Sequence, residues 1–189
     1  MTQTHRTTYN RVAIILHWLM AILLITMLLF GEDMMEAGRE HAENAGASDA
    51  LWLTNLHINL GAAIMILTII RLAWRLANPP PPMPASVKQW EQRAAGLVYG
   101  LFYILMIGLP ITGWFALPAF LAKHPELADL SLFGLTAYPV APALPIKIVI
   151  LHKLGSKVAL ALLALHVLAA LKHQFIDDSK IFSRMMPHG

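Results

Sequence analysis

Four long apolar stretches constrain this chain more than any other feature. They cover residues 12–30, 53–76, 94–117 and 146–172, and a helix needs about 20 mostly apolar residues to cross the hydrocarbon core of a bilayer. Hydrophobic residues make up 57% of the 189 positions and charged residues only 13%, about half the charged fraction of a soluble domain. The sequence therefore predicts an all-α integral membrane protein, a four-helix bundle that forms one domain over residues 1–189.

The first apolar stretch has a competing interpretation as a secretory signal. Arg6 and Arg11 precede it, and small residues follow it in AENAGASDA. The apolar part of a signal is about 7–15 residues long, whereas this stretch runs from Val12 to Phe30 without a charge. We therefore expect it to remain in place as the first membrane helix.

The basic residues predict the orientation of the bundle. On one side of the membrane, residues 1–11, 71–93 and 172–189 hold nine Lys and Arg residues, against three in residues 31–50 and 118–147 on the other side. Because cytoplasmic loops carry the excess of Lys and Arg, both termini are expected in the cytoplasm. The first connection, residues 31–50, is acidic, and the third, residues 118–145, is rich in proline and apolar residues. We expect the third connection to lie on the membrane surface as a cap. The net charge of +3 is small and scattered, so nucleic acid is not an expected partner.

The histidines are the candidate functional residues. The chain has no cysteine, which excludes disulfides, iron–sulfur clusters and thiolate metal sites, and histidine is the commonest remaining metal ligand. A single histidine in a membrane span is as well explained by a hydrogen bond to a neighbouring helix, but ionisable groups there usually mark function. Four of the nine lie in or at the ends of the apolar stretches: His17, His57, His152 and His166. The other five are expected at the surface: His5, His41, His124, His173 and His188.

Depth along the helices sorts these four histidines into two levels. His17 and His166 each lie six residues inside the nearest basic residue on the cytoplasmic side, which is about 9 Å at the helical rise per residue. His57 and His152 lie about 27–30 Å from that same boundary. His152 and His166 share one stretch, where their spacing places them about 21 Å apart and within about 40° of one face. Each level therefore holds a pair of histidines from different helices.

Two facing imidazoles in a dry bundle match the two axial positions of a haem iron. Without a C-x-x-C-H motif the haem must be bound noncovalently, as b-type haem. Zinc would require three or four ligands that converge on one point, and the two levels are too far apart to supply them. The sequence thus predicts two bis-histidine b haems, one held by His17 with His166 and one by His57 with His152.

Basic residues near each level are candidate partners for the haem propionates. Arg71 and Arg75 are expected near the cytoplasmic haem, and Lys153 or Lys157 near the outer one. An equally good explanation for the two arginines is that they mark the cytoplasmic end of the membrane helix, with side chains that extend to the membrane surface.

Small and aromatic residues near the histidines are weaker indicators of a haem site. Gly61 follows His57 by one turn and Gly155 follows His152, and such residues would let a flat macrocycle approach the helix. Gly is also frequent at ordinary membrane-helix contacts. The tryptophans at the ends of the stretches are expected to be interfacial anchors. They are Trp18, Trp74 and Trp114.

Several motifs together with the four histidines resemble the bacterial cytochrome b561 family, which includes di-haem membrane cytochromes and superoxide oxidase. They are LHW at 16–18, RLAWR at 71–75, PITGW at 110–114 and LKHQFIDDSKIFSRM at 171–185. The resemblance implies a single transmembrane cytochrome b domain in the bacterial inner membrane, with the same two ligand pairs and ubiquinone as a partner. The family often has a further histidine early in the third helix, where this chain has Tyr99.

The function that we expect from the residues and the resemblance is transmembrane electron transfer. As an oxidoreductase of the superoxide oxidase type, the protein would pass electrons from periplasmic superoxide to ubiquinone. Lys147, Lys153 and Lys157 would attract this anion, whereas the acidic first connection would repel it. The alternative is a haem b membrane-anchor subunit that accepts electrons from a docked dehydrogenase or hydrogenase. A histidine-based transporter is disfavoured because the sequence shows no paired halves with broken helices.

Overall fold

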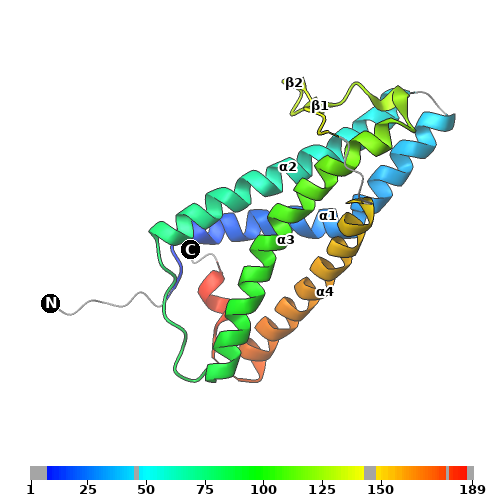
Figure 1. The fold of residues 1–189 in the computed structure, drawn as a ribbon. Helices are drawn as coiled ribbons and strands as arrows, with labels where there is room; N and C mark the ends of the chain where they lie inside the picture. Colours follow the sequence, from blue (N-terminus) through cyan, green and yellow to red (C-terminus); the bar gives the residue numbers. More distant parts are fainter. Residues whose placement is uncertain (1–7, 45–46, 143–147, 178, 187–189) are drawn as a thin grey trace.

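Four long helices form the protein, as Figure 1 shows. The computed structural model describes residues 8–44, 47–142, 148–177 and 179–186. The helices are α1 (Arg11–Asn44), α2 (Ala47–Ala77), α3 (Gln89–Leu121) and α4 (Ile148–Phe175). Each contains a segment that is long and apolar enough to cross a membrane. The predicted four-helix membrane bundle is confirmed.

Short elements distinguish the two ends of the bundle. At one end, which we call the inner end, lie residues 78–88 and the 3-10 helix η2 (Phe182–Met185). At the opposite, outer end lie the 3-10 helix η1 (Pro125–Leu127) and a small antiparallel hairpin of β1 (Ser131–Leu132) and β2 (Thr136–Ala137). The beginning of α1 and η2 thus lie at the same end (Figure 1).

The first two helices are longer than expected. The sequence predicted a connection over residues 31–50, but α1 continues to Asn44 and α2 begins at Ala47. The residues from Gly31 to Asn44, GEDMMEAGREHAEN, are charged, but they contain no proline and many strong helix formers. Charge limits how far a helix enters lipid, not how far it extends beyond it. The prediction that residues 31–50 connect two helices was therefore wrong, because most of these residues belong to the helices themselves.

The other helix ends lie close to the expected positions. Helix α3 starts earlier than expected, at Gln89, and the Glu91 carboxylate accepts a hydrogen bond from the backbone N–H of Lys88 just before it (3.1 Å). It continues through Pro110 and Pro118 to Leu121.

Packing places a small apolar core in the middle of the bundle. Helix α1 packs mainly on α2, and α3 packs on α2 and α4. The buried centre consists of Met20, Leu24, Ile64 and Met106. Large apolar side chains on the outside stay exposed, including Ile22 at 62%. This distribution suits a bundle whose outer surface is covered by lipid.

The third connection is fastened to the outer half of α2 by two asparagines. Asn55 Oδ1 accepts a hydrogen bond from the Ser131 backbone N–H (2.8 Å), and Asn59 Nδ2 donates to the Ser131 carbonyl (2.9 Å). Asn59 Oδ1 also accepts from the Phe133 N–H (2.7 Å), and Leu127 of η1 is completely buried. The described part of this connection forms a cap at the outer end, in agreement with the sequence-based expectation.

Candidate functional site

The outer pair of histidines, His57 of α2 and His152 of α4, face each other across the bundle. Their ring centres are 6.2 Å apart and the ring planes are inclined by 60°. The two rings come from helices that are not consecutive in the chain, as the sequence predicted from depth alone.

Two glycines from the remaining helices lie directly against the outer pair. A Cβ at Gly31 of α1 would lie 3.3 Å from His57 Cε1, and a Cβ at Gly113 of α3 would lie 3.1 Å from His152 Cε1. All four helices therefore contribute to this site. The sequence pointed instead to Gly61 and Gly155, one turn after the two histidines. Gly61 lines the nearby cavity, but a Cβ at Gly155 would contact Leu109, not an imidazole.

The orientation of the His152 ring is set by α3. His152 Nδ1 lies 2.9 Å from the Leu109 carbonyl and 3.2 Å from Thr112 Oγ1, which itself donates to that carbonyl (2.8 Å). A carbonyl only accepts, so Nδ1 carries the proton and donates it to Leu109. The neutral ring then keeps its lone pair on Nε2, the arrangement typical of a metal-binding histidine. On the facing ring, Nδ1 of His57 is buried against Gly31 and makes no hydrogen bond of ordinary geometry with the described residues.

A cavity of about 550 Å³ lies beside the outer pair. Both imidazoles line it, together with apolar side chains of the core such as Leu24 and Met106. At its polar end lie Glu32 and Lys153, whose side chains are largely exposed. The cavity thus extends from the apolar middle of the bundle to the outer surface.

The inner pair, His17 of α1 and His166 of α4, repeats this geometry at the other level. Their ring centres are 6.3 Å apart and the planes are inclined by 67°. Arg71 Nη1 lies 3.1 Å from His17 Nδ1, and the edge of Phe102 contacts His166 with ring centres 5.6 Å apart. Both predicted pairs are therefore brought together by the fold.

The apolar core separates the two pairs. Met20 and Leu24 follow His17 along α1, and Ile64 lies between the two levels on α2. Since α4 is a single unbroken helix, the 14 residues from His152 to His166 span about 21 Å. A layer of apolar side chains therefore lies between the two histidine pairs.

The ring separations test whether these residues fit an iron-centred macrocycle. A metal–imidazole nitrogen bond is about 2.0 Å long and a ring centre lies about 1.1 Å beyond that nitrogen, so two imidazoles on opposite sides of one metal have centres about 6.2 Å apart. The observed values are 6.2 and 6.3 Å. With the cavity beside His57 and the absence of Cβ atoms at Gly31 and Gly113, the residues of the outer pair fit a haem, and the inner pair has the same ring separation.

The basic residues proposed as propionate partners have three different environments. Arg71 contacts the inner pair directly. Arg75 lies over the ring of Tyr99, 5.5 Å from its centre, and Lys153 Nζ is paired with Glu32 Oε1 at 2.6 Å. Of these three residues, Arg71 is the one whose side chain contacts a histidine of a predicted ligand pair.

Two histidines expected at the surface are in fact mostly covered. The side chain of His124 is 13% exposed and lies beside Glu126, and that of His173 is 15% exposed. His173, Glu91 and Asp177 bring their ligand atoms within 4.8 Å of one another, but Lys172 Nζ already pairs with both carboxylates, at 2.9 and 2.6 Å. The hydrogen bond from Lys172 holds the pKa of the Asp177 carboxyl below its usual value. This cluster ties the inner ends of α3 and α4 together.

Known proteins of similar sequence support a haem at this site. Residues 8–188 match the family described as Prokaryotic cytochrome b561. The chain belongs to this family. Its members are membrane cytochromes, so this cytochrome b561 protein binds b-type haem and transfers electrons in a membrane. Its four spanning helices fit a multi-pass protein of the inner membrane, in contact with lipid.

Curated relatives align with nearly the whole chain. Cytochrome b562 of Cereibacter sphaeroides is 28% identical over 97% of this chain and 98% of its own length. Cytochrome b561 homolog 1 of Escherichia coli is 30% identical, over 95% of this chain and 97% of its own. A protein named probable superoxide oxidase CybB, from Yersinia pestis, is 27% identical, over 95% and 96%. Two of these relatives are named as cytochromes b562 or b561, and the third is named for a probable enzymatic activity.

Proposed function

We propose that this cytochrome b561 protein carries electrons across the membrane through two b haems, from superoxide on the periplasmic side to ubiquinone. The observation that carries the proposal is the pair of facing imidazoles at each of two levels, with ring centres 6.2 and 6.3 Å apart. Because the ligands are about 21 Å apart along α4, an electron would cross the bilayer in two shorter steps.

The protein side chains have distinct roles in this proposal. The haems supply one-electron oxidation and reduction. His152 is held in its ligating tautomer by Leu109, and Arg71 provides a positive charge at the inner pair. Met20 is buried in the apolar core between the two levels and does not line the outer cavity, so it would separate the inner pair from that cavity. The two imidazoles of each pair would hold the haem and would leave no free site for oxygen species at the metal, so electron transfer from superoxide would not require binding there.

The overall reaction is balanced by two one-electron donors. Two superoxide anions each lose one electron and leave as dioxygen, and ubiquinone takes up the two electrons and two protons to become ubiquinol. The name of the Yersinia pestis relative supports superoxide as the donor, as does the outer cavity, which reaches the surface beside Lys153.

Stopped-flow mixing of the oxidised holoprotein with superoxide tests this reaction directly. With ubiquinone present, haem reduction should be faster than spontaneous dismutation, and ubiquinol should accumulate at half the amount of superoxide that the protein oxidises, after subtraction of the dismutated part. Haem reduction no faster than dismutation would remove superoxide as the donor. The membrane-anchor alternative, in which a docked dehydrogenase or hydrogenase delivers electrons, would then be the better description.

The charged groups at the cavity mouth predict opposite effects on this rate. Changing Lys153 and Lys157 together to Gln should lower the second-order rate constant for superoxide roughly two- to threefold, since exposed charges act over about 8 Å at physiological salt. Glu32→Gln should raise it by a similar factor, because Glu32 Oε1 neutralises Lys153. Both effects should fade at high salt while haem content stays constant. Changes of the same sign in both variants would contradict the electrostatic explanation.

The proposal also requires the inner end to face the cytoplasm. The nine-to-three distribution of Lys and Arg over the connecting segments supports this orientation. A reporter that is active only in the cytoplasm should therefore be active when fused after Gly189, and one that is active only in the periplasm should be silent. The reverse result would exchange the donor and acceptor sides of the protein.

A further inference from the structure

The chain after α4 turns back toward α1 and forms what we call the C-terminal hook, residues 179–186. Ser179 closes the end of α4, where its N–H and Oγ both donate to the His173 carbonyl (3.0 and 2.9 Å). Lys180 then adopts a left-handed backbone conformation (φ 53°), which reverses the chain. Figure 1 shows η2, in red, between the inner ends of the α1–α2 pair and the α3–α4 pair.

The hook is fastened to three other parts of the inner end. The indole Nε1 of Trp18 donates to the Met185 carbonyl (2.7 Å), and the Trp18 ring meets Phe182 edge to face, with centres 6.2 Å apart. The Tyr9 N–H donates to the Arg184 carbonyl (3.3 Å), and Arg184 Nη2 donates to the Pro82 carbonyl (3.0 Å). The hook thereby bridges α1, the segment before α1 and the connection between α2 and α3.

Trp18 connects the hook to the inner histidine pair. Its ring meets the His17 ring edge to face, with centres 5.3 Å apart. Trp18 is therefore in contact with the hook and with His17 at the same time. A change in the hook has a direct structural route to the inner imidazole.

We infer that the C-terminal hook and Trp18 seal the inner haem against water and so set its redox potential. The inference rests on the inner haem of the proposed function. Solvent exposure is one of the protein's main controls over a haem potential, and a ferric haem carries one more positive charge than a ferrous haem. Water that reaches the inner haem would therefore stabilise the oxidised form and lower the potential. Trp18 acts here as a positioning residue, through His17 and the hook.

Trp18→Phe tests the seal without removing the aromatic ring. The variant loses the hydrogen bond to Met185 and keeps an apolar ring beside His17. In the holoprotein we expect the potential of the inner haem to fall and its reoxidation by dioxygen to accelerate severalfold, while haem content and the potential of the outer haem stay unchanged. Backbone amides of the hook and of the first turns of α1 should also exchange with deuterium faster.

The outer end offers a matched control. Trp114 Nε1 donates to the Pro139 carbonyl, so Trp114→Phe removes the same kind of bond near the other membrane face. It should leave the inner haem potential and the exchange of hook amides at wild-type values. A chain that ends at Asp177 removes the hook altogether and should lower the inner potential at least as far as Trp18→Phe.

Haem stoichiometry separates failure of this inference from failure of the proposed function. If His17→Ala leaves the haem content of the protein unchanged, no haem is held by the inner pair and the proposed function fails. If the inner haem is present, but Trp18→Phe and the shortened chain both keep its potential and its reoxidation rate, the hook is not a seal and the inference is overturned.

Discussion

Replacing His152 with alanine is expected to halve the haem content of the protein, from two haems per chain to one. Its ring faces His57 at the separation that one iron requires, and a haem with one ligand removed loses half of its axial coordination. His57→Ala should give the same loss, and His166→Ala should remove the other haem. Measurement of haem per chain after purification, by the pyridine haemochrome method, checks all three variants.

His124 supplies the control for these variants. Its side chain is 13% exposed and also lines the outer cavity, but its ring lies beside Glu126 and Phe120. His124→Ala should therefore keep both haems. A wild-type content of one haem or none, or two haems retained in His152→Ala, would contradict the two-haem proposal.

Gly113→Val is expected to abolish binding of the outer haem and to leave the inner one in place. A Cβ at position 113 would lie 3.1 Å from His152 Cε1, and the two methyl groups of valine would extend farther toward the ring. The imidazole would have to leave its hydrogen bond to Leu109, and with it the orientation that presents Nε2. We expect haem content near one per chain and an unchanged spectrum for the haem that remains.

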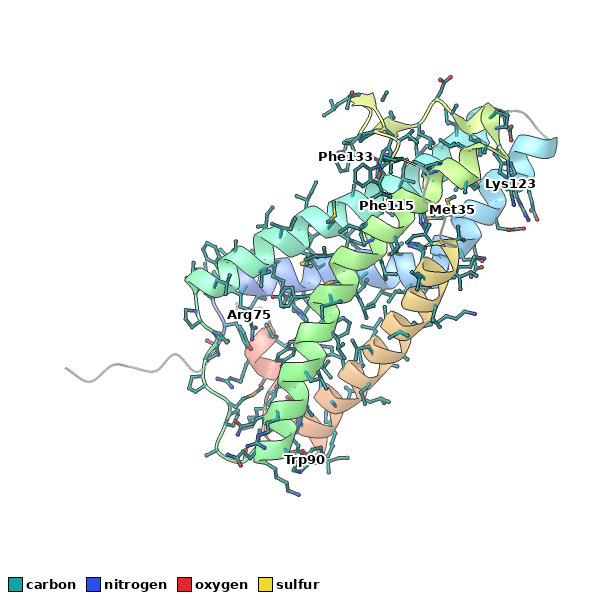
Figure 2. The ribbon with its side chains drawn as sticks, viewed as in Figure 1. Met35, Arg75, Trp90, Phe115, Lys123 and Phe133 are labelled. Carbon is teal, nitrogen blue, oxygen red and sulfur yellow. The ribbon has the colours of Figure 1, made fainter. Side chains whose placement is uncertain are left out.

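Gly108→Val is the matched substitution, because it lies on the same helix and a Cβ there would have no atom within 4 Å. It should retain both haems, which would show that valine in α3 is tolerated where no imidazole is near. Equal haem loss in both variants would indicate a general defect of α3, and two haems in Gly113→Val would remove the proposed role of this close contact. Figure 2 shows the side chains along α3, from Trp90 near its inner end to Phe115 near the outer one.

The axial arrangement of the site was predictable from the sequence. A helix rises by a constant amount per residue, so the spacing of each histidine from the basic residues predicted two levels, and the structure brings His17 to His166 and His57 to His152. The same reasoning failed for residues 31–50, because hydropathy reports where lipid ends and not where the helix ends. The structure continues α1 to Asn44.

Contacts that depend on helix rotation and on distant loops were not predictable. Gly31 and Gly113 lie against imidazoles of other helices, and neither is one turn from a histidine in the sequence. Glu32 neutralises Lys153 across 121 positions of chain, and the hook reaches Trp18 from the opposite terminus. No short-range periodicity in the sequence marks such pairs.

The sequence by itself therefore determined that the protein is a four-helix membrane bundle with imidazoles at two depths, because membrane length and helical rise are properties of each segment alone. Only the tertiary structure decided which glycines make room for the rings, which cation meets an imidazole, and what closes the inner end. These features arise where separate segments meet, and their energies depend on the relative rotation and packing of helices that the local sequence does not encode.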